Sequence, residues 1–297
     1  MDQLESFLGT VGGIVWGPFM LIPLLLGTGI YLTFRLGGIQ FLRLGAALRL
    51  GLIKRKDDDA EGDISQFQAL TTAMAATVGT GNIVGVATAI SIGGPGALFW
   101  MWVTGVLGMA SKYSEAFLGV RFRTTDTAGE KSGGPQYYLE RGIPGGFGKA
   151  LALAFAIFAV CASFGIGNMT QGNSISSNVE GSFGIPLWIT GAVLAILTLA
   201  VLVGGIKSIA KVSSGFVPIM IVFYVVGAIW ILIVNIGDVP AAIALIFTDA
   251  FSGTAAVGGF AGSALILAVQ MGVARGAFSN ESGMGSAAIA AAAAQTT

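Results

Sequence analysis

Long stretches without a charged residue are the feature that most limits what this chain can fold into. An α-helix needs roughly 20 consecutive apolar residues to cross the hydrocarbon core of a bilayer. Stretches of at least that length lie at 6–34, 64–111, 150–179, 181–206, 212–237 and 250–274. The chain is therefore predicted to be an integral membrane protein built from transmembrane helices.

The composition agrees with this class and excludes several others. Hydrophobic residues make up 54% of the chain and charged residues only 10%, whereas an ordinary globular protein has about 25% charged residues. There is no histidine and a single cysteine, Cys161, which excludes histidine triads, histidine metal sites, disulfides and CxxC motifs. Acidic and basic residues balance at 15 each, so no positive field favours nucleic acid. With no nucleophile and base pair in the apolar stretches, no enzyme is expected.

The apolar stretches divide into seven predicted helices. The stretch 64–111 is too long for one span and contains GGPG at 93–96, a turn cluster that ends helices. The predicted spans are 11–34, 66–92, 97–120, 150–172, 186–206, 213–235 and 258–294. The fold class is accordingly all-α and membrane-integral.

Lysine and arginine predict the orientation, because cytoplasmic loops retain these residues and translocated loops do not. Fourteen of the fifteen lie in three segments, 35–65, 112–149 and 207–212. None lies at the N-terminus or in 93–96, 173–185 and 236–257. We therefore expect a multi-pass protein of the cell (inner) membrane with its N-terminus outside and its C-terminus in the cytoplasm. Asp2 and Glu5 precede the first apolar stretch, so no cleaved signal peptide is expected.

The second predicted helix carries an interruption near its middle. Ser65 and Gln68 form a capping-box pattern that places its start on the cytoplasmic side. The sequence TVGTGN at 77–82 then brings glycines and an asparagine to bilayer depth, where unsatisfied backbone groups are costly. One interpretation is close helix packing through the GxxxG pair Gly81 and Gly85. The other is a broken helix, whose carbonyls bind a cation and whose second-half N-terminus faces an anionic group.

A second interruption lies in the last predicted helix, in RGAFSNESGMGS at 275–286. Arginine and glutamate inside a span each cost about 2.5–3.5 kcal/mol on insertion scales, so a functional site is the first hypothesis. The alternative is that the span ends near Ala274 and that a cytoplasmic tail follows. The apolar alanine-rich stretch 287–294 is unlike a solvated tail. Two glycine-broken helices, separated by the length of a five-helix repeat, predict the binding site of a transporter with inverted repeats.

Polar amides lie late in the predicted helix 150–172. Asn168 and Gln171 are three residues apart and share a helix face. They fit either interhelical hydrogen bonding or contact with a ligand.

Six sequence blocks together resemble the sodium:alanine symporter family, whose members transport alanine or glycine and share the inverted-repeat fold of the bacterial leucine transporter. The resemblance covers essentially the whole chain. The blocks are EGDISQFQAL at 61–70, AATVGTGNI at 75–83, GGPGA at 93–97 with FWMW at 99–102, GGPQY at 133–137, FGIGNM at 164–169 and RGAFSNE at 275–281.

The resemblance implies sodium-coupled symport of a small neutral amino acid, alanine or glycine, by alternating access. It implies that amides near Gly79, Thr80, Gly81 and Asn82 bind the substrate carboxylate, and that carbonyls near Gly276 and Ala277 bind its ammonium group. Gln171 and Phe278 would close the pocket. Sodium, the co-transported ion, would be bound in part by the backbone carbonyls of Ala75 and Val78, which suits a hard cation.

The resemblance also implies a division of the chain. Residues 1–35 would form an extra N-terminal helix, 36–65 a cytoplasmic loop, 66–235 the first five-helix repeat, and 236–297 an external loop with the first broken helix of the second repeat. Members of the family continue beyond the point that matches Thr297. We therefore expect an incomplete second repeat, with the remaining sodium ligands outside this chain. The alternative function is a truncated, transport-inactive membrane fragment of such a symporter.

Overall fold

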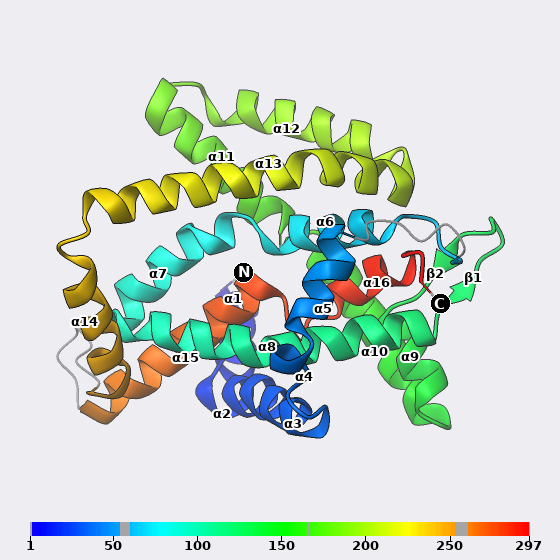
Figure 1. The fold of residues 1–297 in the computed structure, drawn as a ribbon, viewed down its shortest axis with the longest axis horizontal. Helices are drawn as coiled ribbons and strands as arrows, with labels where there is room; N and C mark the ends of the chain where they lie inside the picture. Colours follow the sequence, from blue (N-terminus) through cyan, green and yellow to red (C-terminus); the bar gives the residue numbers. More distant parts are fainter. Residues whose placement is uncertain (1, 54–59, 166, 253–260, 297) are drawn as a thin grey trace. The chain divides into compact units, whose positions relative to one another are not determined.

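The structure is a computed structural model that describes residues 2–53, 60–165, 167–252 and 261–296. Apart from one short hairpin, its described elements are helices (Figure 1). The elements before residue 60 are α1 (Asp2–Val15), α2 (Pro18–Ile22), the π-helix η1 (Pro23–Gly27), α3 (Thr28–Arg35), α4 (Ile39–Leu42), α5 (Leu44–Leu48) and the π-helix η2 (Arg49–Ile53).

The remaining elements follow in chain order. They are α6 (Gln66–Thr77), the 3-10 helix η3 (Thr80–Asn82), α7 (Val84–Gly93), α8 (Gly96–Arg121), β1 (Thr124–Thr125), β2 (Lys131–Ser132), α9 (Pro135–Gly142), α10 (Gly146–Ser163), α11 (Asn168–Phe183), α12 (Leu187–Leu202), α13 (Gly205–Val234), α14 (Val239–Ser252), α15 (Ala261–Asn280) and α16 (Ser286–Ala292). Strands β1 and β2 form an antiparallel pair in which Thr124 faces Ser132.

Local sequence signals explain several helix ends. Ser65 and Gln68 form the predicted capping box at the start of α6, each side chain accepting the other residue's backbone N–H. Pro135 occupies the first turn of α9, where a missing N–H is harmless. Gly94, with φ +76°, follows α7 in a conformation that favours glycine.

The residue contacts divide the chain into two compact units. The first unit comprises Met1–Leu44, Gly81–Ser114 and Val222–Met284; the second comprises Gly45–Thr80, Glu115–Ile221 and Gly285–Thr297. In the first unit α15 packs against α7 and α2. In the second unit α9 packs against α10, α11 against α12, and α16 against α6 (Figure 1).

Small residues form much of the buried interior. In the second unit, α16 approaches its neighbours so closely that a Cβ on Gly119 would lie 2.5 Å from the carbonyl oxygen of Ala288. A Cβ on Gly133 would lie 2.6 Å from the methyl carbon of Ala292. Large apolar side chains point outward instead, such as Phe223 on α13, which is 83% exposed. This distribution, small inside and apolar outside, is typical of a protein whose solvent is lipid.

Three helical stretches of the described residues are long and apolar enough to cross a membrane: Glu5–Arg35, Gly146–Phe183 and Gly205–Val234. The halves α6 and α7 form a fourth if they are taken as one broken span. Apolar helices of spanning length confirm the prediction of a membrane protein. The number of seven spans and the repeat boundaries stay predictions.

The structure differs from the sequence interpretation for one predicted helix and adds helices within two predicted loops. The single helix expected over 150–172 is two helices, because the chain turns after Ser163 and Gly167 adopts φ +83°. The expected cytoplasmic loop 36–65 contains α4, α5 and η2, and its residues 54–59 lie outside the described part. The expected external segment 236–257 contains α14. Its residues 253–257, like Ile166, also lie outside the described part.

Candidate functional site

The first predicted interruption is a break in the helix. Helix α6 ends at Thr77, and Val78 follows with an extended backbone (φ −96°, ψ 100°). A short 3-10 turn then holds Thr80, Gly81 and Asn82 before α7 begins at Val84. The sequence TVGTGN therefore interrupts the helix.

The carbonyls at the end of α6 have the chemistry of a cation site. The last helical hydrogen bond runs from the N–H of Val78 to the carbonyl of Met74, 2.8 Å away. Within the described residues, no hydrogen bond reaches the carbonyl oxygens of Ala75 and Val78. They lie at the negative end of the α6 dipole, and oxygen ligands of this kind suit a hard cation. The described residues hold no cluster of His, Cys, Asp and Glu side chains that would offer another metal site.

Two predicted site residues meet in the second unit. Gln171 lies in the first turn of α11, and its side-chain amide reaches the backbone of Gly79. A Cβ on Gly79 would lie 3.0 Å from Nε2 and 3.1 Å from Oε1 of Gln171. Glycine at this position therefore lets a side-chain amide approach the exposed main chain of the break. Asn168 has a structural role instead, because its Nδ2 donates to the carbonyl of Ser163 across the turn between α10 and α11.

Two further predicted residues meet in the first unit. Gly81 is buried, and a Cβ there would lie 3.0 Å from Cδ1 of the Phe278 ring on α15. The packing interpretation required a similar approach at Gly85, but a Cβ on Gly85 would have no heavy atom within 4 Å. The close approach of α7 to α15 occurs at Gly93, where a Cβ would lie 3.0 Å from the Cβ of Met271. Gly81 thus borders the break and Phe278, whereas the described residues leave open space beside the Cβ position of Gly85.

A hydrogen bond links Asn82 to Ser279, a residue that the sequence interpretation did not single out. The Ser279 hydroxyl donates to Oδ1 of Asn82 and joins the first interruption to α15. The two residues are 197 positions apart in the sequence. Its position directly after Phe278 in the RGAFSNE block could have identified Ser279 as a site residue.

The second interruption lies later than its sequence suggested. Helix α15 continues through Gly276, Ala277 and Phe278 to Asn280, and the break occupies residues 281–285. The carbonyl of Ala277 accepts the N–H of Glu281 at 2.8 Å, so it can offer a ligand only its second lone pair. Gly276 is buried, and a Cβ there would lie 3.1 Å from the Cβ of Thr104 on α8.

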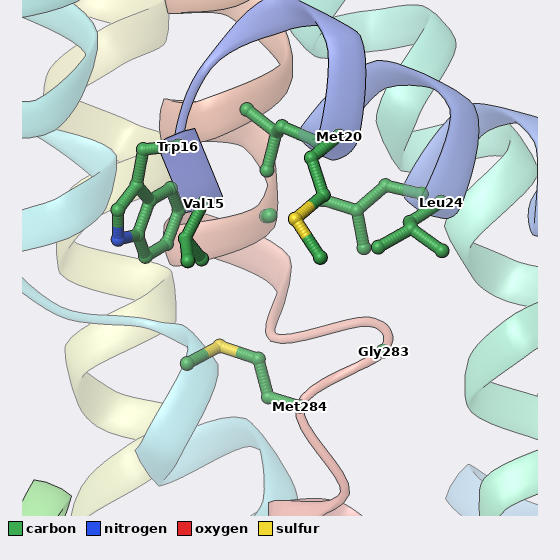
Figure 2. A pocket seen from close by; sticks show the side chains of 9 residues that line it. Val15, Trp16, Met20, Leu24, Gly283 and Met284 are labelled. Carbon is green, nitrogen blue, oxygen red and sulfur yellow. The ribbon is translucent and has the colours of Figure 1, made fainter. Parts of the chain in front are cut away.

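An apolar cavity of about 170 Å³ borders the same break in the first unit. Figure 2 shows Val15, Trp16, Met20 and Leu24 on one side and Met284 on the other. Of the predicted site residues, the cavity lining includes Ala277 alone. An amino-acid zwitterion needs charged or hydrogen-bonding partners, so this apolar cavity is not by itself the predicted substrate site.

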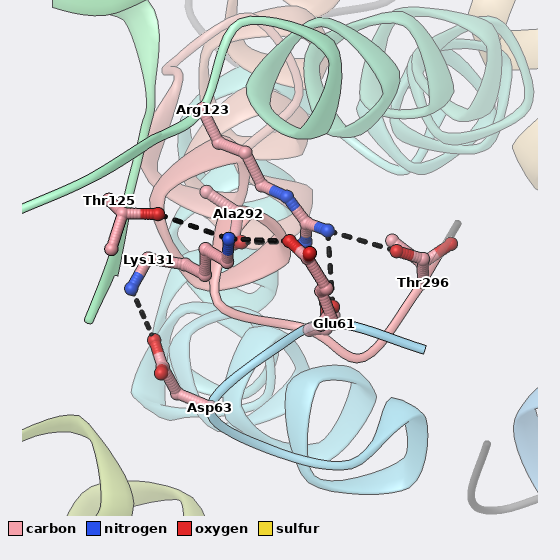
Figure 3. Close-up of polar contacts among 8 residues, drawn as sticks. Glu61, Asp63, Arg123, Thr125, Lys131, Ala292 and Thr296 are labelled. Carbon is pink, nitrogen blue, oxygen red and sulfur yellow. Dashed lines mark hydrogen bonds and ion pairs between the residues drawn. The ribbon is translucent and has the colours of Figure 1, made fainter. Parts of the chain in front are cut away.

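A polar cluster holds the end of α16 in the second unit (Figure 3). Arg123 Nη1 donates to the carbonyls of Ala292 at 3.2 Å and Ala294 at 2.8 Å. Its Nη2 donates to the carbonyls of Glu61 at 3.1 Å and Thr296 at 2.9 Å. The guanidinium thus satisfies carbonyls that the helix end leaves without partners.

Lys131 extends this cluster. Its Nζ lies 2.7 Å from a carboxylate oxygen of Glu61, and its backbone N–H donates to Asp63. The hydrogen bond from Lys131, helped by its charge, lowers the pKa of the Glu61 carboxyl from its ordinary value. The cluster fixes the strand-like segment before α6 beside the end of α16, where Asp63 N–H also donates to the carbonyl of Ala293.

Helices that break at glycine-rich sequences within apolar spans, and that expose main-chain polar groups there, are a recurring feature of membrane proteins of the secondary-transporter class. A sequence model of the sodium:alanine symporter family matches residues 1–297. The chain belongs to this family.

Curated relatives agree with the assignment. The chain is 55% identical over 292 residues to the "Sodium/alanine symporter AgcS" of Methanococcus maripaludis, covering 98% of this chain and 63% of the relative. It is 41% identical to the "Probable sodium/glutamine symporter GlnT" of Bacillus subtilis, covering 99% of this chain and 59% of the relative. It is 36% identical to the "Putative sodium/proton-dependent alanine carrier protein YrbD" of the same organism, covering 99% of this chain and 58% of the relative. The chain thus spans about three fifths of the length of these relatives.

Proposed function

We propose that the protein takes up a small neutral amino acid, alanine or glycine, in symport with sodium by alternating access. The observation that carries this proposal is the first break, where carbonyl oxygens without hydrogen-bond donors among the described residues and closely approached glycines occur within seven residues, 75–81. A cation and an amino acid are the ligands that such main-chain groups suit. The name of the Methanococcus maripaludis relative, a sodium/alanine symporter, points to the same pair.

In this proposal the first interrupted helix binds the carboxylate of the substrate and the last one binds its ammonium group. Backbone amides from Gly79 to Asn82 bind the carboxylate, because the start of α7 carries the positive end of a helix dipole. Carbonyls of Gly276 and Ala277 bind the ammonium group, and sodium is bound in part by the carbonyls of Ala75 and Val78.

The same contacts support a small substrate. A single added Cβ on Gly79 would meet the Gln171 amide at 3.0 Å, and one on Gly81 would meet the Phe278 ring at the same distance. The space beside each glycine is therefore narrow. This crowding favours a substrate with no side chain or a methyl group, and glutamine, named for one relative, is disfavoured.

The test is uptake by the full-length gene product in proteoliposomes. An inward sodium gradient should drive accumulation of labelled alanine, and sodium replaced by choline should abolish it. Unlabelled glycine should compete and unlabelled glutamine should not. Accumulation driven by a proton gradient without sodium would refute the coupling ion, and stronger competition by glutamine would refute the substrate class. No accumulation under either gradient would refute symport.

A further inference from the structure

The second break is contacted by one face of α8 in the first unit. Thr104, Gly108 and Lys112 are spaced by four residues and therefore share a helix face. Thr104 packs at Gly276, and a Cβ on Gly108 would lie 2.6 Å from the hydroxyl oxygen of Ser282. This stripe of α8 therefore lies along the C-terminal end of α15 and reaches the break.

Lys112, the last residue of the stripe, brings a charge to that end. Its Nζ donates to the backbone carbonyls of Asn280 and Glu281, each 3.3 Å away. The same Nζ lies 3.9 Å from a carboxylate oxygen of Glu281. The side chains of Lys112 and Glu281 are 23% and 20% exposed, so this ion pair lies largely out of water.

The backbone that Lys112 contacts has an unfavourable conformation. Glu281 has φ +53° and is the one residue other than glycine with a positive φ in the described part of the chain. This region is unfavourable for a residue with a side chain, because the Cβ lies too close to the following carbonyl oxygen. Lys112 contacts the carbonyls of Asn280 and Glu281 and the carboxylate of Glu281. These contacts stabilise the unfavourable conformation.

These oxygens form the ligand set that an alkali cation uses in a broken helix. Two main-chain carbonyls at the negative end of the α15 dipole and one carboxylate converge on a single positive centre. Here that centre is an ammonium group covalently attached to α8. Because Lys112 carries the charge itself, no ion has to be taken from solution to hold this break.

We propose that Lys112 is a resident cation of the second break, a positioning residue that occupies a cation site and removes the need for a sodium ion there. The consequence for transport rests on the proposed function: sodium coupling would involve the first break and not the second. The consequence for ion binding does not depend on transport. Removing the ammonium group while keeping Glu281 should create a sodium site in the protein.

The test compares Lys112→Ala with three other variants. Lys112→Arg keeps the charge, Lys112→Met removes it but fills the space, and Lys149→Ala removes a charge from an exposed lysine whose side chain has no hydrogen bond or ion pair among the described residues. Thermal unfolding of the purified full-length protein is measured without alanine, in sodium and in choline. Sodium should stabilise Lys112→Ala more than the wild type by mass action. Lys112→Arg, Lys112→Met and Lys149→Ala should respond as the wild type does.

The second readout is sodium-dependent alanine binding. In Lys112→Ala the sodium concentration for half-maximal binding should rise at least about tenfold, equal to about 1.4 kcal/mol, and its dependence should become steeper because one more ion binds. If the wild type binds no alanine with sodium, the proposed function fails, while the stabilisation readout still decides the role of Lys112. Equal sodium stabilisation of Lys112→Ala and the wild type would overturn the inference.

A further prediction applies if Lys112→Ala folds poorly. Sodium or methylammonium present during extraction should then restore the folded protein, because either ion can take the place of the ammonium group. Failure of both ions to restore it, with Lys112→Met folded, would overturn the inference as well.

Discussion

Arg123 offers a direct test of how the end of α16 is held. Replacing it with alanine removes the donor of two carbonyls at that end, one on fully buried Ala292 and one on half-buried Ala294. A buried acceptor left without a donor costs about 1–3 kcal/mol, so the pair should cost about 2–6 kcal/mol. Unfolding entropy is about 2.1 cal/mol/K per residue, so in a chain of 297 residues a loss of 1 kcal/mol lowers the unfolding temperature by about 1.6 °C. We therefore expect Arg123→Ala to lower it by at least about 3 °C.

Hydrogen exchange locates the effect. In Arg123→Ala, amides of the paired segments 61–64 and 292–296 should exchange faster, because their main-chain hydrogen bonds lose the group that spans them. Arg121 provides the matched control, since it is the last residue of α8, lies two residues before Arg123 and is exposed, and its side chain has no hydrogen bond in the described part of the chain. Arg121→Ala should leave both measurements near wild type. Equal effects of the two substitutions would refute the reasoning, because general loss of positive charge would then explain them.

Two other predictions concern the first break and the orientation. Gly81→Ala places a Cβ 3.0 Å from the Phe278 ring, and overpacking of about 1 kcal/mol or more should weaken sodium-dependent alanine binding at least about fivefold. Gly85→Ala, which has open space at its Cβ, is the control and should bind alanine normally. An equal loss of binding in both variants would favour the packing interpretation. In a Cys161→Ala background, Thr127→Cys should resist an impermeant thiol reagent added to intact cells and Glu180→Cys should react, because the lysine and arginine distribution places these exposed positions on opposite sides. The reverse pattern of labelling would invert the topology.

The sequence predicted well those features that depend on neighbouring residues. The capping box of Ser65 and Gln68 begins α6 as expected, since both partners lie within one turn. The polar stretch 77–82 interrupts a helix because its glycines and asparagine favour non-helical backbone. The turn after Ser163 was missed because the apolar pattern continues across it, and the positive φ of Gly167 was the decisive local feature.

Contacts between distant parts of the chain could not be predicted from one sequence. Lys112 reaches the carbonyl of Asn280 across 168 residues, and Arg123 reaches that of Ala292 across 169. The sequence interpretation used Lys112 and Arg123 only as markers of the cytoplasmic side. Nothing local distinguishes a cation that satisfies a helix end from one that is solvated.

The alanine surface of α16 has a thermodynamic consequence. Burying a leucine or a methionine freezes rotamers, whereas burying an alanine freezes none. Ala287, Ala288 and Ala292 are buried, the last two beside Gly119 and Gly133 respectively, positions that have no side chain, so the packing of α16 costs little side-chain entropy. Its docking free energy then depends on backbone proximity and on the polar groups at its end, and any enlarged side chain on this face would add both a steric clash and an entropic penalty.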